Sequence, residues 1–222
     1  MFTHIITELP QLRTTTYKGQ RWYETPEGNF YPSITTVLGV KKKQYLLDWQ
    51  KSLGPAKAQK EVERTKLRGD AIHLMLEKHL KNDSNPTEGH EIEHIKRFNQ
   101  VKLVLNRLNN IRTQEAALYS DYLGVAGRVD CIAEFDGILS IIDFKSSSGN
   151  KQEDMIEDYF LQETFYAMAF TEMTSMPVEQ IVTLMAVERG IVPLVFKKSI
   201  EPYVIPLQKR IDEFYVTASI NI

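Results

Sequence analysis

The stretch "GRVDCIAEFDGILSIIDFKSS", residues 127–147, decides the fold because it predicts a β-hairpin with a defined register. Asp136-Gly137 separates two runs that are rich in β-branched and apolar residues. This pair favours a two-residue type I′ turn, in which both residues need positive φ. If these two residues form the loop, Phe135 pairs with Ile138, and all later cross-strand pairs follow from that one.

Two carboxylates and two cations fall on one face of this hairpin. The register places Asp130 opposite Asp143, and Arg128 opposite Lys145. Like charges directly opposite each other destabilise a sheet, because their Cβ atoms lie about 4.5–5.5 Å apart. A divalent cation such as Mg²⁺ or Mn²⁺ explains the pair, and Lys145 could then orient water and stabilise negative charge. The alternative is a solvated face with salt bridges inside each strand.

The other face of the hairpin is apolar, and we expect it to be the buried one. Elsewhere the pattern predicts short strands within residues 11–31, a helix after Ser33, helices at 55–80, 88–109, 153–173 and 202–216, and strands at 115–120, 125–135, 181–187 and 192–197. Helices followed by a mixed sheet with a crossover helix indicate the α/β class. We expect one domain, divided into a basic and aromatic N-terminal segment (1–54), a helical part (55–110), the core (111–200) and a C-terminal helix (201–222).

Composition limits the class of protein. The 222 residues are 42% hydrophobic and 25% charged, as in an ordinary globular protein. No apolar run approaches the about 18 residues of a membrane span, and the start of the chain lacks the plan of a signal peptide. We therefore expect an intracellular protein without a membrane partner. A single cysteine excludes an internal disulfide, a four-cysteine zinc site and a cysteine-ligated iron–sulfur cluster.

Positive charge is concentrated in the N-terminal third. Residues 1–68 hold 12 lysines and arginines against 6 acidic residues. A polyanion-binding surface has this composition when aromatic side chains are available to stack on bases. The alternative is a solvated helix face with aromatic residues in the core. The aromatic candidates are Trp22, Tyr23, Tyr31, Tyr45 and Trp49, and the basic residues include Lys41, Lys42 and Lys43.

A zinc protease motif must also be considered. Residues 90–94 match HExxH, in which His90 and His94 would hold Zn²⁺, Glu91 would act as general base and Glu115 could be a third ligand. This model gives no role to the hairpin carboxylates. The same residues also suit the solvated start of a helix. His73, taken alone, is typical of a core residue of its helix.

Four motifs in a fixed order resemble the PD-(D/E)xK nucleases, in particular the RecB-like branch with the mitochondrial genome-maintenance exonucleases and their phage relatives. They are "RGDAIH" at 68–73, "GRVD" at 127–130, "IIDFKSS" at 141–147 and "QETFY" at 162–166, preceded by "YPSITTVLG" at 31–39. The resemblance covers roughly residues 30–170. It implies a restriction-endonuclease-like core, which is a mixed central sheet flanked by helices, with a helical N-terminal cover.

The resemblance also implies roles for individual residues. Asp130, Asp143 and Lys145 would be catalytic, and a divalent metal, Mg²⁺ or Mn²⁺ but no iron–sulfur cluster, would be held at this site. The metal ligands would be His73, Asp130, Asp143, the Phe144 carbonyl and Glu115. The residues expected to contact DNA are Gln162, Tyr166, Arg128, Ser146, Ser147 and Arg68.

The sequence thus predicts a metal-dependent DNA exonuclease that prefers single-stranded DNA or frayed ends, in DNA replication, recombination or repair. Alternatives are an endonuclease of the same superfamily, a non-catalytic nucleic-acid-binding module and, remotely, the HExxH metalloprotease. We expect a cytoplasmic protein of a bacterium or phage-infected host, with a mitochondrial location as the alternative. The sequence does not determine the oligomeric state, and a monomer is one of the options.

Overall fold

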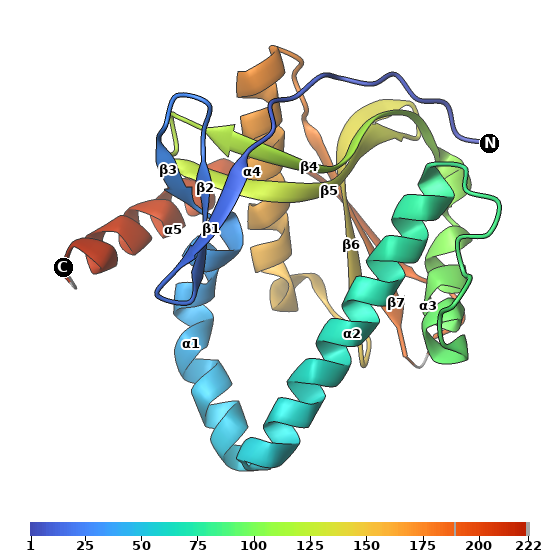
Figure 1. The fold of residues 1–222 in the computed structure, drawn as a ribbon, viewed down its shortest axis with the longest axis horizontal. Helices are drawn as coiled ribbons and strands as arrows, with labels where there is room; N and C mark the ends of the chain where they lie inside the picture. Colours follow the sequence, from blue (N-terminus) through green and yellow to red (C-terminus); the bar gives the residue numbers. More distant parts are fainter. Residues whose placement is uncertain (189, 221–222) are drawn as a thin grey trace.

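A five-stranded mixed sheet forms the centre of the protein in a computed structural model, which describes residues 1–188 and 190–220 apart from the side chains of 42–45 and 219–220. Neighbouring strands are antiparallel except β6 and β7, which are parallel. Helix α4 (Glu157–Thr174), which follows a short 3-10 turn (Glu153–Met155), is the crossover between the parallel pair. In order, the strands are β4 (Leu108–Ser120), β5 (Val125–Phe135), β6 (Ile138–Ser147), β7 (Gln180–Val187) and β8 (Leu194–Ser199) (Figure 1).

Both faces of this sheet are buried, whereas the sequence predicted one buried face. Ile132 and Ile141 share the predicted charged face, yet neither is exposed to solvent, because α4, the start of α1 and α5 (Glu201–Ile220) cover that side. The opposite side packs against the second half of α2 and against α3 (Ile92–Lys102). A parallel pair joined by a helix is normally covered on both sides, which explains the difference.

Helices α1 (Ile34–Leu53) and α2 (Pro55–Leu80) diverge from Gly54 like the two sides of a V (Figure 1). The Ser33 hydroxyl caps α1 by accepting from the Thr36 N–H at 3.1 Å, as the sequence predicted. Pro55 opens α2, also as predicted. The apolar residues of α2 are buried unevenly: Ala58 near its start is 1% exposed, whereas Val62 is 48% exposed, because this part of the helix projects away from the sheet.

The helix predicted at 88–109 is shorter than expected. Gly89 has a φ of 76° in the preceding turn, so α3 starts only at Ile92. After Lys102 the chain forms a 3-10 turn (Leu105–Arg107) and enters β4 at Leu108, so this strand crosses the predicted boundary at residue 111. The helix predicted at 202–216 extends to residue 220 as α5, and residues 221–222 of the predicted C-terminal segment lie outside the described part.

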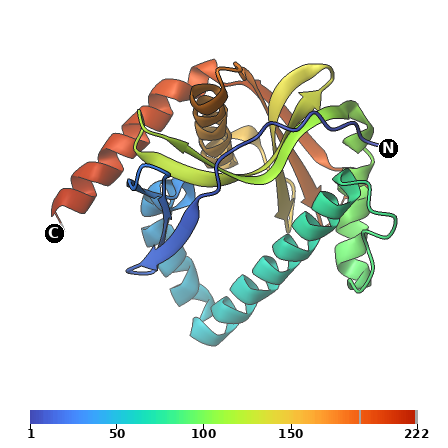
Figure 2. The same ribbon diagram turned by 45° about the horizontal axis from the view of Figure 1, so that its top comes forward.

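The N-terminal strap, residues 1–12, runs along the outer edge of β4 (Figure 2). The Ile5 N–H donates to the Ile111 carbonyl at 2.8 Å, and the Thr7 N–H donates to the Arg112 carbonyl at 2.9 Å. The strap then leaves β4 and enters a small sheet of β1 (Arg13–Tyr17), β2 (Gln20–Glu24) and β3 (Phe30–Pro32). The sequence did not predict this pairing.

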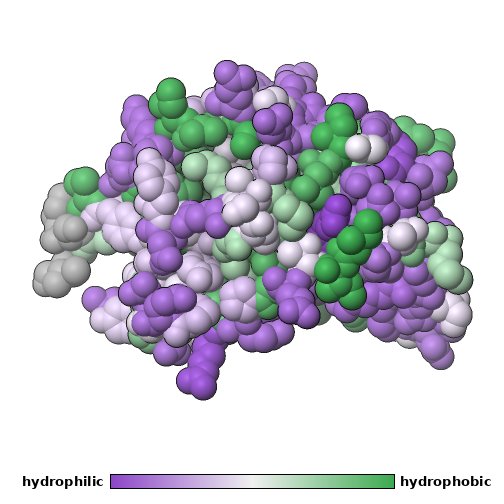
Figure 3. Space-filling model, turned by 90° about the horizontal axis from the view of Figure 1, so that it is seen from above, coloured by the Kyte–Doolittle hydropathy of each residue, from purple (hydrophilic) through white to green (hydrophobic). Residues whose placement is uncertain are grey.

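None of the described helices is long and apolar enough to cross a membrane. On the face that carries the strap, hydrophobic side chains form small groups separated by hydrophilic ones (Figure 3).

Candidate active site

The hairpin of β5 and β6 has the predicted turn and register over its outer half. Asp136 and Gly137 have φ values of 54° and 81°, as a type I′ turn requires. The ladder runs from Phe135–Ile138 to Cys131–Ile142 with the predicted partners. The register of this half of the hairpin is therefore confirmed.

The ladder ends one pair before the two aspartates, which corrects the prediction that Asp130 and Asp143 form a cross-strand pair. Asp130 Oδ2 instead accepts a hydrogen bond of 2.8 Å from the Phe144 N–H. The side chain thus replaces the backbone acceptor that β5 would have supplied. The strands separate where the two carboxylates would have repelled each other.

In both β4 and β5 the side chains change from one face of the sheet to the other, and the change occurs at the same level of the two strands. Val129 and Ala116 pack in the core beneath α4, whereas Cys131 faces α2, and Gln114 donates to the Glu77 carbonyl of α2 at 3.3 Å. Residues two apart on a strand normally share a face. The exchange of faces occurs at Glu115, which has a φ of 50° inside β4 and lies level with Asp130. This backbone conformation gave no signal in the sequence.

His73 reaches this point from the middle of α2. Its Nε2 lies 2.7 Å from the Phe144 carbonyl oxygen, and its Nδ1 lies 3.5 Å from Asp130 Oδ1. Ligand atoms of His73, Glu115 and Asp130 all lie within 4.8 Å of one another, and residues 1–188 and 190–220 contain no other such group of three. One imidazole and two carboxylates suit Mn²⁺ or Mg²⁺ when further oxygen donors are near. The residues present therefore fit the predicted metal.

The HExxH motif does not form a comparable site among the described residues. His90 lies before Glu91, the N-cap of α3, so His90 and His94 do not occupy successive turns of one helix. This arrangement removes the geometric basis of the zinc-protease alternative.

Asp143 and Lys145 form a tight pair on β6. Lys145 Nζ lies 2.7 Å from Asp143 Oδ1 and 2.5 Å from Oδ2, and Asp143 is 1% exposed. Burial raises the pKa of Asp143 to about 6, so the carboxyl is still ionised at neutral pH. Burial opposes the charge of Lys145, but the Asp143 and Asp130 carboxylates hold its pKa above the ordinary value. The pair is a carboxylate and an ammonium.

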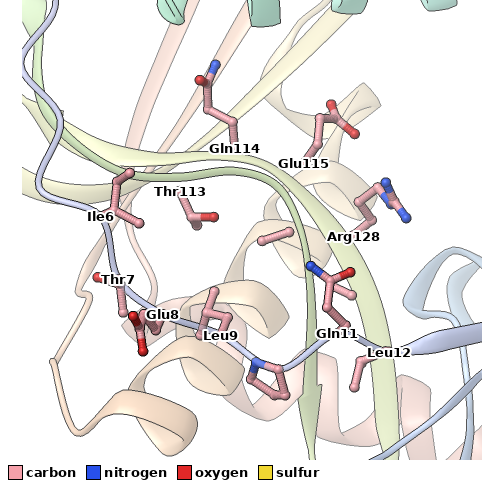
Figure 4. A pocket seen from close by; sticks show the side chains of 13 residues that line it. Ile6, Thr7, Glu8, Leu9, Gln11, Leu12, Thr113, Gln114, Glu115 and Arg128 are labelled. Carbon is pink, nitrogen blue, oxygen red and sulfur yellow. The ribbon is translucent and has the colours of Figure 1, made fainter.

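Glu115 has the other perturbed carboxyl of the site. Burial, followed by the charge of Asp130, raises its pKa to about 7. Figure 4 shows Glu115 and Arg128 extending to the same side of the strands, away from the strap. Without a cation, the site therefore holds a proton at Glu115 near neutral pH.

Gln162 and Tyr166 lie one turn apart on α4, as predicted. Gln162 Nε2 donates to Tyr166 Oη at 3.1 Å, and Tyr166 is 2% exposed. The ring of Tyr166 packs against the backbone of β5 at Gly127, where a Cβ would lie only 2.8 Å from a ring carbon. This glycine is required by close packing and precedes Asp130 by three residues.

Sequence reasoning missed Glu163, the neighbour of Gln162. It is 0% exposed and accepts a hydrogen bond from the Thr183 hydroxyl on β7. Its Oε2 has no hydrogen-bond partner among the described atoms. Burial, and next the charge of Asp143, raises the pKa of Glu163 well above its usual value. An acidic residue inside the apolar run of α4 was the available signal.

The residues predicted to contact DNA differ in how far they are exposed to solvent. Arg68 is buried, forms an ion pair with Glu188 and donates to the Ser146 hydroxyl at 3.2 Å. Ser147 is also buried, and its hydroxyl accepts from the Gly149 N–H at 3.3 Å. Arg128 is exposed beside Glu115.

The arm, which we define as residues 40–67 of α1 and α2, carries most of the predicted basic surface. It holds eight lysines and arginines against three acidic residues. A hollow of about 400 Å³ lies at its base and is lined by Lys66, His73 and Glu115 among others. Tyr23, predicted to be available for base stacking, is 1% exposed and belongs to the core. The predicted surface residues Lys42, Lys43 and Tyr45 have side chains outside the described part.

A second hollow of about 340 Å³ lies between the strap and β4 (Figure 4). Glu8 and Gln11 line it from the strap, and Thr113 and Glu115 line it from β4. Glu115 thus lies between the two hollows.

Comparison with known proteins shows which family part of this chain is similar to. Residues 93–202 match the family model of the PD-(D/E)XK nuclease superfamily. The chain is similar to mitochondrial genome maintenance exonuclease 1 of Homo sapiens, with 29% identity over 152 residues (62% of this chain and 40% of the relative). The same protein of Mus musculus has 27% identity over 131 residues (55% and 39%). The chain spans about two fifths of the length of these relatives.

Among solved structures, the crystal structure of SSO0001 is similar with a TM-score of 0.48 and 14% identity, over 83% of this chain and 75% of that one.

Proposed function

Because residues 93–202 of the chain belong to the PD-(D/E)XK nuclease superfamily, we propose that the protein is a metal-dependent deoxyribonuclease that hydrolyses phosphodiester bonds. One observation carries this proposal. His73, Asp130 and the backbone of Phe144 come from three different elements and meet within hydrogen-bonding distance. The Asp143–Lys145 pair lies on the same strand as Phe144. A structural salt bridge alone would not require the neighbouring imidazole and carboxylates.

In this proposal His73, Glu115, Asp130, Asp143 and the Phe144 carbonyl hold Mg²⁺ or Mn²⁺. When bound, the cation would polarise a phosphodiester and make water more acidic. Lys145 orients the attacking water and stabilises the negative charge that develops as the 3′-oxygen leaves. Gln162, Tyr166 and Arg128 position the DNA backbone beside these groups.

We propose further that the enzyme acts on ends of single-stranded or frayed DNA. The exposed lysines of the arm suit the phosphates of a strand, and the hollow at its base leads to His73 and Glu115. The strap covers the outer edge of β4 beside the second hollow. Both curated relatives are named as exonucleases, which supports an end-dependent activity in DNA replication, recombination or repair.

Digestion of labelled DNA tests the proposal. Linear and circular substrates, single-stranded and double-stranded, are incubated with and without Mg²⁺. Linear single strands should be degraded only with the cation, and Lys145→Ala should abolish the activity, whereas Lys96→Ala, a change of an exposed lysine on α3, should not. Degradation by Lys145→Ala at the wild-type rate would refute the mechanism.

The same digest separates the alternatives. Rapid cutting of closed single-stranded circles would identify an endonuclease. Binding of DNA without hydrolysis under any cation would identify a non-catalytic module. Hydrolysis of casein that His90→Ala stops would revive the metalloprotease reading.

A further inference from the structure

Glu163 is a buried carboxyl that the proposed reaction does not yet use. It lies on α4 over the parallel strands β6 and β7, where Asp143 and Thr183 are in register. The Thr183 hydroxyl occupies one carboxyl oxygen of Glu163, and the second oxygen has no hydrogen-bond partner among the described atoms. Burying a carboxyl with an unsatisfied oxygen costs stability. A purely structural residue at this position would be apolar, like Phe160, Ala167 and Phe170, which are also buried on α4.

The side of α4 that bears Glu163 also faces Lys145. Tyr159 precedes Glu163 by one helical turn, so the two residues share a face. The Lys145 ammonium lies 5.1 Å from the centroid of the Tyr159 ring. The charge of Lys145 acts on Glu163 and opposes the effect of burial on its pKa. Lys145 is therefore held between Asp143 on its own strand and this face of α4.

The Asp143 carboxylate cannot keep its present contacts with Lys145 and also bind a cation. Its Oδ1 accepts a hydrogen bond from the ammonium at 2.7 Å, and its Oδ2 lies 2.5 Å from the same nitrogen as an ion-pair contact without hydrogen-bond geometry. A metal ligand must offer at least one oxygen to the cation. When Asp143 turns to the cation, Lys145 needs another acceptor, because its side chain is only 19% exposed and an ammonium that is largely removed from water is costly to leave unpaired.

We propose that Glu163 is a positioning residue that accepts the Lys145 ammonium when Asp143 binds a divalent cation. Lys145 remains an ammonium throughout, and the carboxyl proton of Glu163 leaves to solvent as the ammonium arrives. The inference rests on the proposed function, because it assumes that Asp143 is a metal ligand. Glu163 itself touches neither DNA nor the cation in this proposal.

A double-mutant cycle on Mn²⁺ affinity tests this role without DNA. The dissociation constant of Mn²⁺ is measured by isothermal titration calorimetry for the wild-type chain, Glu163→Gln, Lys145→Met and the double variant. Gln keeps the oxygen that accepts from Thr183 but cannot receive the ammonium as a carboxylate does. Glu163→Gln should therefore weaken Mn²⁺ binding about tenfold in the presence of Lys145, a coupling within the usual range for residues in contact.

In the Lys145→Met background the same substitution should change the affinity less than about twofold, because no ammonium needs a new partner. Thr164→Val is the matched control: it removes a buried hydroxyl from the adjacent position of α4 and should leave the affinity unchanged in both backgrounds. Glu163→Asp shortens the side chain by one methylene and so moves the carboxylate away from Lys145. It should give an intermediate loss of Mn²⁺ affinity, and it replaces the Gln variant if that variant does not fold.

An equal loss of affinity in both backgrounds, or no loss in either, overturns the role of Glu163 while leaving the metal site intact. If the wild-type chain does not bind Mn²⁺, the proposed function fails, and the inference fails with it.

Discussion

Glu115→Gln should make the protein more stable than the wild type at alkaline pH in the presence of chelator. Burial and the charge of Asp130 raise the pKa of Glu115 from 4.5 to about 7. The folded protein therefore holds this proton more tightly than the unfolded chain does, and the wild type loses stability as pH rises from about 4.5 to about 7. Glutamine does not titrate, so this loss is absent from the variant.

The shift would correspond to about 3.4 kcal/mol for a fully buried group. Glu115 is only half-buried, so solvent screening reduces the expected effect to about 1.5 kcal/mol. For a chain of this size that equals about 3–6 °C in melting temperature. The variant should match the wild type near pH 4.5, apart from a constant offset, and gain this difference above pH 7.

Thermal melts in EDTA from pH 4.5 to pH 8 measure the effect. Glu88→Gln, which removes an exposed carboxyl from the loop between α2 and α3, is the control and should follow the wild type at every pH. With Glu115 as one of the proposed metal ligands, Mn²⁺ should reverse the order, because it would stabilise the wild type more than a variant that lacks this carboxylate. A difference between Glu115→Gln and the wild type that does not change with pH would refute the argument that Glu115 is protonated in the folded state.

Substitutions at Gly127 and Asp130, each with a comparison variant, test the packing and hydrogen bonding around the site. Gly127→Ala should lower stability by about 1–3 kcal/mol, because its Cβ would lie 2.8 Å from a ring carbon of Tyr166. Gly69→Ala in the interior of α2, where an added Cβ would have no atom within 4 Å apart from its chain neighbours and the backbone of its own helix, should raise stability by up to about 1 kcal/mol. The reverse order in thermal melts would contradict the structure. Asp130→Ala leaves the Phe144 N–H without its acceptor and should cost about 1–3 kcal/mol in urea denaturation. Asp130→Asn keeps an oxygen acceptor and should cost less, so equal losses would show that this hydrogen bond does not matter for stability.

The sequence predicted the outer half of the hairpin because turn chemistry and alternation act locally. Asp136-Gly137 sets the first pair, and each later pair follows by geometry. The inner half could not be predicted in this way. There the side chain of Asp130 accepts a hydrogen bond from the backbone of β6, and Glu115 adopts a positive φ. Both features lie where His73 of α2 contacts Phe144 and Asp130, and such contacts join residues far apart in the sequence.

Burial was the other quantity that pattern alone could not give. The spacing of Val62 with Ile72 and Leu76 predicts one continuous stripe, but only the latter two have a sheet beside them. Glu163 shows the opposite error. Its charge suggests an exposed position, yet α4 is surrounded on nearly all sides and buries it. A helix that is apolar around most of its circumference predicts such burial, and the few acidic residues within it are then candidates for a site.

The N-terminal strap must dock late in folding, because its partners lie far along the chain. Phe2 is held by Asn82, and Ile5 by Ile111, so these contacts close loops of about 80 to 106 residues. Contacts of such long range form slowly, after the helices and β4 are in place. Until then the outer edge of β4 offers unpaired N–H and C=O groups to any other strand. Amide hydrogens of the strap should accordingly exchange with solvent sooner than those of β5 and β6, and newly synthesised chains are most prone to associate during this interval.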